Sequence, residues 1–223
     1  MATLVSDILT NIGYRLYRDS TTISSTSQPT QTECIQWINE TCEEILTVCV
    51  ELNSEIGRTT PAAISLVDGT ATYTDLADLL FAPVIYRDMD GEQFSGWIEK
   101  TSERVPLRLI TESELINHNP STEAQPTCFY ITGANSLVFI PTPDDSYTFK
   151  IPYYGYLTAL TATTDTLPFM RIFDHIITES VVMRAQNREE YELGYELRWF
   201  KYIRDQARKI LFMRKNPTRR ISV

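Results

Sequence analysis

The side chains best suited to catalysis or metal binding are two histidines and one pair of adjacent aspartates. His118 lies in the polar stretch INHNPS, which is typical of a solvated loop, and His175 lies in FDHIITE. Since neither histidine has the further ligands that a metal centre or a proton relay requires, we interpret both as surface residues. A hydrolase that uses Asp144 and Asp145 is an alternative, but adjacent residues on a strand point to opposite faces, so this pair indicates a turn.

A group of acidic residues resembles the ligand set of a calcium-binding loop. The carboxylates at the ligand positions belong to Asp88, Asp90, Glu92 and Glu99. Such a loop needs glycine at its sharp turn, where this sequence has Gln93, and the flanking segments have the pattern of strands instead of helices. We therefore interpret the group as a charged β-hairpin tip.

No catalytic sequence motif is present. With only eight glycines, the chain has neither a dinucleotide-binding fingerprint nor a phosphate-binding loop, and it lacks the G-x-S-x-G and H-E-x-x-H motifs. We therefore predict that the protein is not an enzyme and that it uses no cofactor and no metal.

The cysteines indicate buried thiols. The chain has four of them, Cys34, Cys42, Cys49 and Cys128. The first three, at spacings of eight and seven residues, share one face of a helix, and no pair has the short gap of a zinc or redox motif. Free cysteine behaves as a small apolar residue, so we expect thiols packed in a core, in a reducing compartment.

Charge is distributed unevenly along the chain. The formal net charge is −9. From residue 198 onward one acidic residue stands against nine basic residues, namely Arg198, Lys201, Arg204, Arg208, Lys209, Arg214, Lys215, Arg219 and Arg220. This end carries +8, which leaves −17 on residues 1–197. An acidic body argues against sequence-specific DNA binding, while the basic end either seeks an acidic partner surface or complements the dipole at the end of a helix.

The periodicity of apolar residues predicts helices at both ends of the chain. Residues 3–18 and 31–52 repeat apolar side chains at helical spacing, and the polar stretch between them predicts a helical hairpin. Two further helices are predicted, over residues 169–187 and 189–215. The expected apolar face of the last helix consists of Tyr195, Trp199, Tyr202, Ile203, Gln206 and Ile210.

Between the helices, the pattern changes to short alternating strands. Asp68-Gly69 and Asp90-Gly91 each separate two strand-like runs, which predicts two β-hairpins. Further strand-like runs are VPLRLIT, TCFYITG, SLVFIPTP and SYTFKIPYYGY, with the short helical segment ESELINH after the first. Closely spaced short strands predict a central antiparallel sheet or barrel, so the expected fold class is α+β.

We expect one compact domain with four parts. These are a helical hairpin in residues 1–57, a β-rich body in 58–167, C-terminal helices in 168–215 and an extended basic tail in 216–223. No stretch approaches the roughly 20 apolar residues that span a bilayer, and the first residues lack the features of a signal peptide.

Residues 126–186 resemble the head-to-tail adaptor, or connector, proteins of tailed bacteriophages. The features that carry the resemblance are, in order, the strand PTCFY, the strand LVFIPTP with its Pro-x-Pro end, the tyrosine-rich strand YTFKIPYYGY, the link TTDTLP and the helix that follows it. The stretch LVSDILTNIGYRL near the start is similar to the first helix of such adaptors. The cysteine-bearing helix and the basic end depart from this pattern.

The resemblance implies a structural virion protein that forms a ring between the portal and the tail and lines the DNA channel. It implies portal protein and tail or nozzle proteins as partners, and a homo-oligomer of about twelve copies. The implied location is the neck or tail of the virion, after assembly in the host cytoplasm and without membrane contact. DNA would pass without sequence recognition, which suits an acidic body. The alternatives are a neck or tail structural protein without portal contact, and a tail-associated hydrolase.

The last residues form the candidate docking segment. Pro217 ends the helix, and residues 216–223 are too few to build a core of their own. The candidate docking residues are Arg214, Lys215, Arg219, Arg220, Ile221 and Val223. Ile221 and Val223 alternate as in an extended strand, so we expect the segment to add a strand to the portal or to a neighbouring adaptor.

Overall fold

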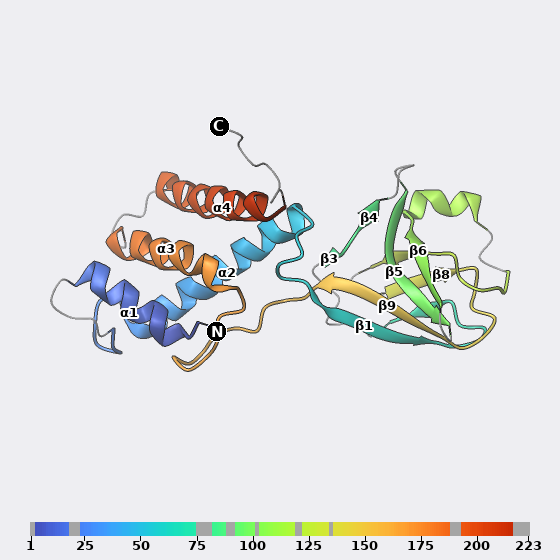
Figure 1. Ribbon diagram of the computed structural model, residues 1–223, viewed down its shortest axis with the longest axis horizontal. Helices are drawn as coiled ribbons and strands as arrows, with labels where there is room; N and C mark the ends of the chain where they lie inside the picture. The colour runs from blue at the N-terminus through green and yellow to red at the C-terminus, as the bar shows by residue number, and fades with distance from the viewer. Residues whose placement is uncertain are drawn as a thin grey trace, which may run out of the picture. The chain divides into compact units, whose positions relative to one another are not determined.

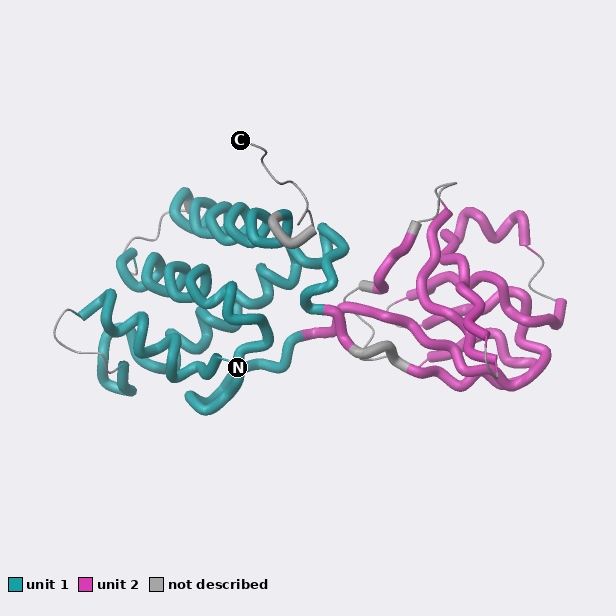
Figure 2. Tube along the Cα trace, in the orientation of Figure 1, with its two compact units in different colours: residues 1–57, 157–223 teal, residues 58–156 magenta. Residues whose placement is uncertain are grey.

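The structure is a computed structural model that describes residues 3–17, 23–74, 82–87, 92–100, 103–118, 122–133, 136–187 and 193–215. The chain divides into two compact units (Figure 2): a helical unit of residues 1–57 and 157–223, and a β unit of residues 58–156. The β unit is therefore inserted into the sequence of the helical unit. That the whole chain folds as one domain stays a prediction.

Four α-helices build the described part of the helical unit (Figure 1). They are α1 (Val5–Leu16), α2 (Gln31–Glu51), α3 (Asp174–Gln186) and α4 (Leu193–Lys215), with the short 3-10 helix η3 (Arg171–Phe173) before α3. α3 packs against the three other α-helices, and α2 also packs against α4. α1 packs mainly against α3 and less against α2, its neighbour in the sequence. Helices from both ends of the chain therefore share one core.

α2 begins with a capping box. The Thr30 side chain accepts a hydrogen bond from the Glu33 N–H (3.3 Å), and the Glu33 carboxylate accepts one from the Thr30 N–H (2.8 Å). Two N–H groups that lack partners within the helix thus gain acceptors. The helix predicted over residues 31–52 is confirmed, and the apolar side chains that repeat along it are buried: Ile35, Ile38, Cys42, Ile45, Leu46 and Cys49.

The four cysteines are free and buried, as predicted. Burial raises the pKa of Cys34, Cys42 and Cys49 to about 12. Because the thiolate is the reactive form of cysteine, these protonated thiols act as small apolar groups of the core.

α4 buries one side chain per turn, in the order Trp199, Ile203, Ala207 and Leu211. The sequence predicts the first two of these residues. It also places Tyr195, Tyr202, Gln206 and Ile210 on the buried face, whereas all four are half-buried. The observed spacing of four residues is that of the ridge along which helices commonly pack against one another.

The β unit contains one nine-stranded sheet. Its strands are β1 (Thr59–Leu66), β2 (Thr72–Tyr73), β3 (Ala82–Pro83), β4 (Tyr86–Arg87), β5 (Gln93–Lys100), β6 (Glu103–Leu109), β7 (Cys128–Thr132), β8 (Ser136–Ile140) and β9 (Tyr147–Tyr154). The strand order is β1-β9-β5-β6-β7-β8-β2, with β3 paired to β9 and β4 to β5. Helices at both ends of the chain and a central sheet confirm the α+β fold class.

One pair of strands in this sheet, β6–β7, is parallel. Parallel neighbours need a crossover of about a dozen residues or more. Residues 110–127 provide it, and they include the 3-10 helix η2 (Glu112–Asn117). All the other strand pairs in the described part of the chain are antiparallel, as the sequence predicts.

The two predicted hairpins have different outcomes. β4 and β5 pair as the hairpin at Asp90-Gly91 requires, although the turn itself lies outside the described residues. The hairpin at Asp68-Gly69 is wrong, because β1 pairs with β9 and β2 pairs with β8. Gly69 does adopt a left-handed φ of 71°, but its N–H donates to the Pro143 carbonyl (2.8 Å). The turn therefore connects β1 and β2, which stand at opposite ends of the strand order.

Three phenylalanines form the centre of the β unit. The ring of Phe149 lies 4.9 Å from that of Phe139 and 5.1 Å from that of Phe129, both in edge-to-face arrangements. Such geometry stabilises aromatic pairs beyond the burial of their area. The surrounding buried residues are Leu66, Ile98, Leu107, Leu137, Tyr147 and Ile151.

Gly96 lies where β5 crosses this core. Its φ is 75°, and a Cβ at this position would lie 2.5 Å from the Lys150 carbonyl oxygen and 2.8 Å from the Phe149 ring. The register of β5 against β6 is irregular between Phe94 and Trp97, which places Gly96 in a bulge. Both the backbone conformation and the lack of space therefore require glycine.

Gly96→Ala should destabilise the β unit by about 2–4 kcal/mol, because strain and overpacking add. Gly133→Ala is the matched control, since Gly133 also has a positive φ (59°) but no atom within 4 Å of a Cβ. The control should lose only about 1 kcal/mol. Urea unfolding followed by circular dichroism measures both. Equal losses would show that space at Gly96 is not limiting.

Candidate functional site

A line of ion pairs joins α2 to α3 and α4, and we call it the acidic seam. α2 carries five glutamates and neither lysine nor arginine. Glu40, Glu44 and Glu51 are spaced by four and seven residues, so they share one side of the helix. Each of the three pairs with an arginine of α3 or α4.

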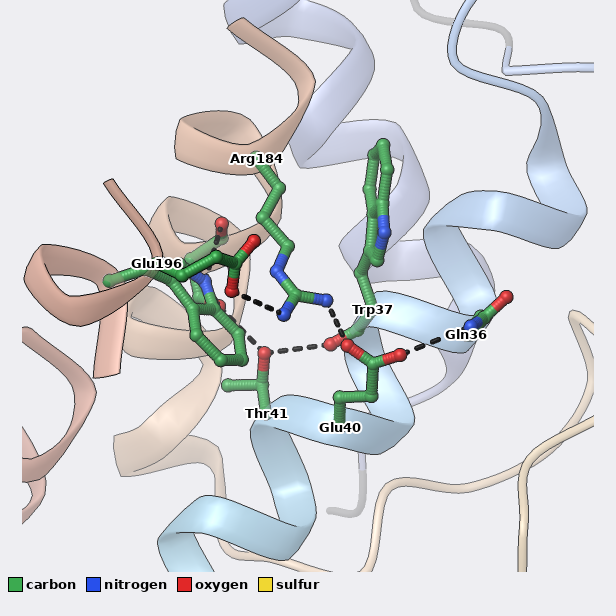
Figure 3. Close-up of polar contacts among 8 residues, drawn as sticks. Gln36, Trp37, Glu40, Thr41, Arg184 and Glu196 are labelled. Carbon is green, nitrogen blue, oxygen red and sulfur yellow. Dashed lines mark hydrogen bonds and ion pairs between the residues drawn. The ribbon is translucent and has the colours of Figure 1, made fainter. Parts of the chain in front are cut away.

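Arg184 of α3 joins three partners at one end of the seam (Figure 3). Its guanidinium group forms ion pairs with Glu40 and, at 3.3 Å, with Glu196 of α4. The guanidinium carbon also lies 3.7 Å from the centroid of the Trp199 ring. The Arg184 side chain is only 12% exposed, so both carboxylates and the ring act on a largely desolvated cation.

A chain of hydrogen bonds runs beneath this arginine. The Trp199 indole N–H donates to the Ser180 hydroxyl (2.9 Å), and the Thr41 hydroxyl donates to the Trp37 carbonyl (2.7 Å). The two hydroxyl oxygens lie 2.6 Å apart. Since Thr41 already donates to the carbonyl, Ser180 must donate to Thr41. Each buried hydroxyl thus donates once and accepts once, and the chain connects α4, α3 and α2.

Two arginines of α4 complete the seam. The Arg204 guanidinium contacts Glu44 (Nε to Oε2, 3.2 Å) and Glu51 (3.4 Å), and Arg208 contacts Glu51 at 2.8 Å. These side chains are between 22% and 42% exposed, so solvent screens them more than it screens Arg184. Two basic residues of the C-terminal segment are therefore used within the subunit.

The seam could have been found from the sequence only in part. The absence of basic residues from α2 and the i, i+4 spacing of Arg204 and Arg208 are visible there. However, periodicity does not say which helix lies opposite the glutamates. The sequence predicts instead that the basic end is available to a partner or complements a helix dipole.

The predicted docking residues lie at the limit of the described structure. Arg214 and Lys215 occupy the last turn of α4, which ends at Lys215. The side chains of these two residues lie outside the described structure, as do Arg219, Arg220, Ile221 and Val223. Their role in docking stays a prediction.

Asp144 and Asp145 lie in a turn, as predicted, and not in a carboxylate pair that faces a cleft. Asp144 accepts a hydrogen bond from the Tyr147 hydroxyl (2.7 Å), and Asp145 accepts one from the Ser146 N–H (2.7 Å). Both aspartates are exposed. The hydrogen bond that Tyr147 donates to Asp144, together with burial, raises the pKa of Tyr147 to about 12.

The two histidines lie apart from one another in the sequence and in different units. His175 is exposed on α3, as predicted. His118 follows η2 and is half-buried instead of solvated, with its Nδ1 3.8 Å from the Cys128 sulfur. Burial raises the pKa of Cys128, so this contact does not generate a thiolate nucleophile.

The structure describes only part of the acidic group that resembles a calcium-binding loop. Asp88 and Asp90 lie outside it, while Glu99 pairs with Lys150 (2.8 Å) and Arg104 (3.4 Å). The hydrogen bond from Lys150 lowers the pKa of Glu99. No group of three or more metal-ligating side chains occurs among the residues described.

Comparison with protein-family models relates the chain to a known family. A family model described as SU10 adaptor protein matches residues 3–220, which is nearly the whole chain and includes both units. No curated protein matches the chain. In the described part of the chain, every helix is too short or too polar to span a membrane.

Arg184→Met should lower the free energy of unfolding by about 2–3 kcal/mol, because it leaves partly buried carboxylates without their cation. The matched control is Arg204→Met, in which a more exposed pair is lost and the cost should be about 1 kcal/mol or less. Urea unfolding at low and high salt measures both variants. Equal decreases in the free energy of unfolding for the two variants would contradict a larger contribution from Arg184 than from Arg204.

The phenol of Tyr147 should titrate near 12, whereas an unperturbed tyrosine titrates near 10. A folded pKa above the unfolded one adds stability that is fully present below pH 10 and is lost as the pH rises toward 12. Tyr147→Phe should remove this alkaline loss of stability, and Asp144→Asn should lower the pKa. Carbon NMR of the tyrosine rings, assigned with the phenylalanine variant, measures the titration. A midpoint near 10 in the unmodified protein would refute the bond to Asp144.

Proposed function

The chain belongs to the SU10 adaptor protein family, structural proteins of bacteriophage virions, and from this premise we propose that it forms a ring between the portal and the tail. The observation that carries the proposal is the family match over residues 3–220. The partners are the portal protein on one side and tail or nozzle proteins on the other. We propose a cyclic homo-oligomer of about twelve copies, since closed symmetry lets identical contacts repeat around a channel.

The distribution of charge supports a channel for DNA. The β unit has 13 acidic and six basic residues, a net charge of −7, whereas the helical unit has 16 and 14, a net charge of −2. A net negative wall lets duplex DNA slide without binding, because like charges repel. The β unit is therefore the better candidate for the wall of the channel.

The internal contacts of each unit support a structural role. In the helical unit, ion pairs and buried hydroxyls hold α2, α3 and α4 together. In the β unit, aromatic packing fixes the sheet. The adjacent carboxylates of Asp144 and Asp145 are engaged in the local hydrogen bonds of a turn. The protein acts in the neck of the virion as a scaffold, after assembly in the host cytoplasm, and not as an enzyme.

The C-terminal residues are the proposed means of attachment. Arg219 and Arg220 supply charge, and Ile221 and Val223 supply alternating apolar anchors for an added strand. Exposed ion pairs contribute only about 0.2–1 kcal/mol each, so the anchors and backbone pairing carry much of the affinity. The receiving edge belongs to the portal or to a neighbouring adaptor.

The direct test mixes the purified full-length protein with portal rings of the same phage. Mass photometry and electron microscopy should show a complex with one adaptor ring per portal. Portal rings that stay bare at high adaptor concentration would contradict portal contact and would favour a neck or tail protein located elsewhere. A broad hydrolase screen on the same sample should show no turnover that depends on Asp144 or Asp145.

Three tail variants separate the contributions to attachment. Deletion of residues 217–223 should abolish it, and Ile221→Ser with Val223→Ser should weaken it at every salt concentration. Arg219→Gln with Arg220→Gln should weaken it at low salt only, because salt screens exposed charges. Attachment that all three variants leave unchanged would show that docking lies elsewhere on the chain.

A further inference from the structure

The side of α4 that faces away from the helical core has both cationic and apolar character. Arg198, Lys201 and Lys209 are exposed there, and they form no ion pair with any residue that the structure describes. Leu197 and Phe212 are 61% and 53% exposed on the same helix. α4 lies at one edge of the helical unit, with α3 between it and α1 (Figure 1). We call this surface the α4 face.

The chain carries an acidic surface of matching character on the β unit. Two turns that are distant in the sequence are joined there by the hydrogen bond from the Gly69 N–H to the Pro143 carbonyl (2.8 Å). The exposed carboxylates of these turns belong to Asp68, Asp144 and Asp145, and Val67 beside them is 53% exposed. We call residues 67–69 and 143–145 the acidic tip.

We infer that the acidic tip of one copy docks on the α4 face of a second copy, an inference that rests on the ring proposed above. Two different and complementary surfaces on one chain are what a head-to-tail contact requires, and such contacts close into a ring when the rotation permits. Opposite charges also fix which surfaces meet and speed their encounter. Each copy would use its tip toward one neighbour and its α4 face toward the other.

The composition of the α4 face favours a protein partner over DNA. A phosphate backbone would gain nothing from Leu197 and Phe212, and it would be repelled by Asp205, which is exposed on the same helix. A protein surface with carboxylates and an apolar side chain satisfies both kinds of group. The acidic tip offers this combination, with Val67 next to Asp68.

Charge reversal on either side tests the contact. The tip variant is Asp68→Lys with Asp145→Lys, and the helix variant is Lys201→Glu with Lys209→Glu. All four side chains are exposed, and none takes part in the acidic seam or in the bond to Tyr147. The control for the tip variant, Glu112→Lys with Glu123→Lys, makes the same change in net charge as that variant, at exposed positions elsewhere on the β unit.

The readout is the adaptor concentration at which rings on portal complexes are half complete, measured by mass photometry. Each reversed variant should need at least about tenfold more protein than the unmodified chain, because like charges would meet at every contact. The control should behave as the unmodified chain. A mixture of the tip and helix variants should assemble again, because alternating copies restore opposite charges at every contact. The variant with all four substitutions should be rescued too.

The outcomes separate this contact from the proposed function. If the unmodified chain fails to bind the portal, the proposed function fails, and sedimentation velocity of the same samples alone at high concentration then tests the contact. Assembly of the reversed variants at the unmodified concentration would overturn the inference. Failure of the mixed tip and helix variants to assemble would also overturn the inference. The reversed charges would then weaken assembly by general repulsion between copies and not at this contact. A defect confined to the helix variant would assign the α4 face to DNA or to the portal.

Discussion

The pairing of the α2 carboxylates with three arginines is the interaction on which the helical unit depends. Glu40, Glu44 and Glu51 line one side of a helix that has no basic residue of its own, so they would repel one another without partners. The partners come from α3 and α4, which follow α2 only after the whole β unit. The bundle therefore forms only when the two ends of the chain meet, and the β unit is held between them in the sequence as an insertion.

This pairing also determines what α4 can offer to a partner. The buried stripe that begins at Trp199 contacts the core, while Arg204 and Arg208 are neutralised by α2. Arg198, Lys201 and Lys209 are exposed on the same helix as the exposed apolar side chains of Leu197 and Phe212. One helix thus presents three sides: a buried side, a side paired with α2 and an exposed side.

Local signals in the sequence anticipate local structure well. The helix predicted over residues 31–52, its buried apolar residues and the helix end at Lys215 follow from short-range patterns. The Asp68-Gly69 turn is also real, but its hairpin is not, because which strands pair is decided by packing around Phe129, Phe139 and Phe149. The acidic seam escapes prediction for the same reason, since helical periodicity shows which side of α2 is polar but not what lies opposite. The family resemblance, which rests on the order of strands and turns, is confirmed by the match to the SU10 adaptor protein family.

Electron cryo-microscopy of the intact virion tests the central claim, that this protein is a ring-forming adaptor, more directly than any measurement on isolated components. The account predicts density for the α+β subunit as a closed ring of about twelve copies at the junction of portal and tail. In that density, the C-terminal residues should be ordered against a neighbouring chain. A chain found at low copy number away from the neck, or absent from the particle, would contradict the account.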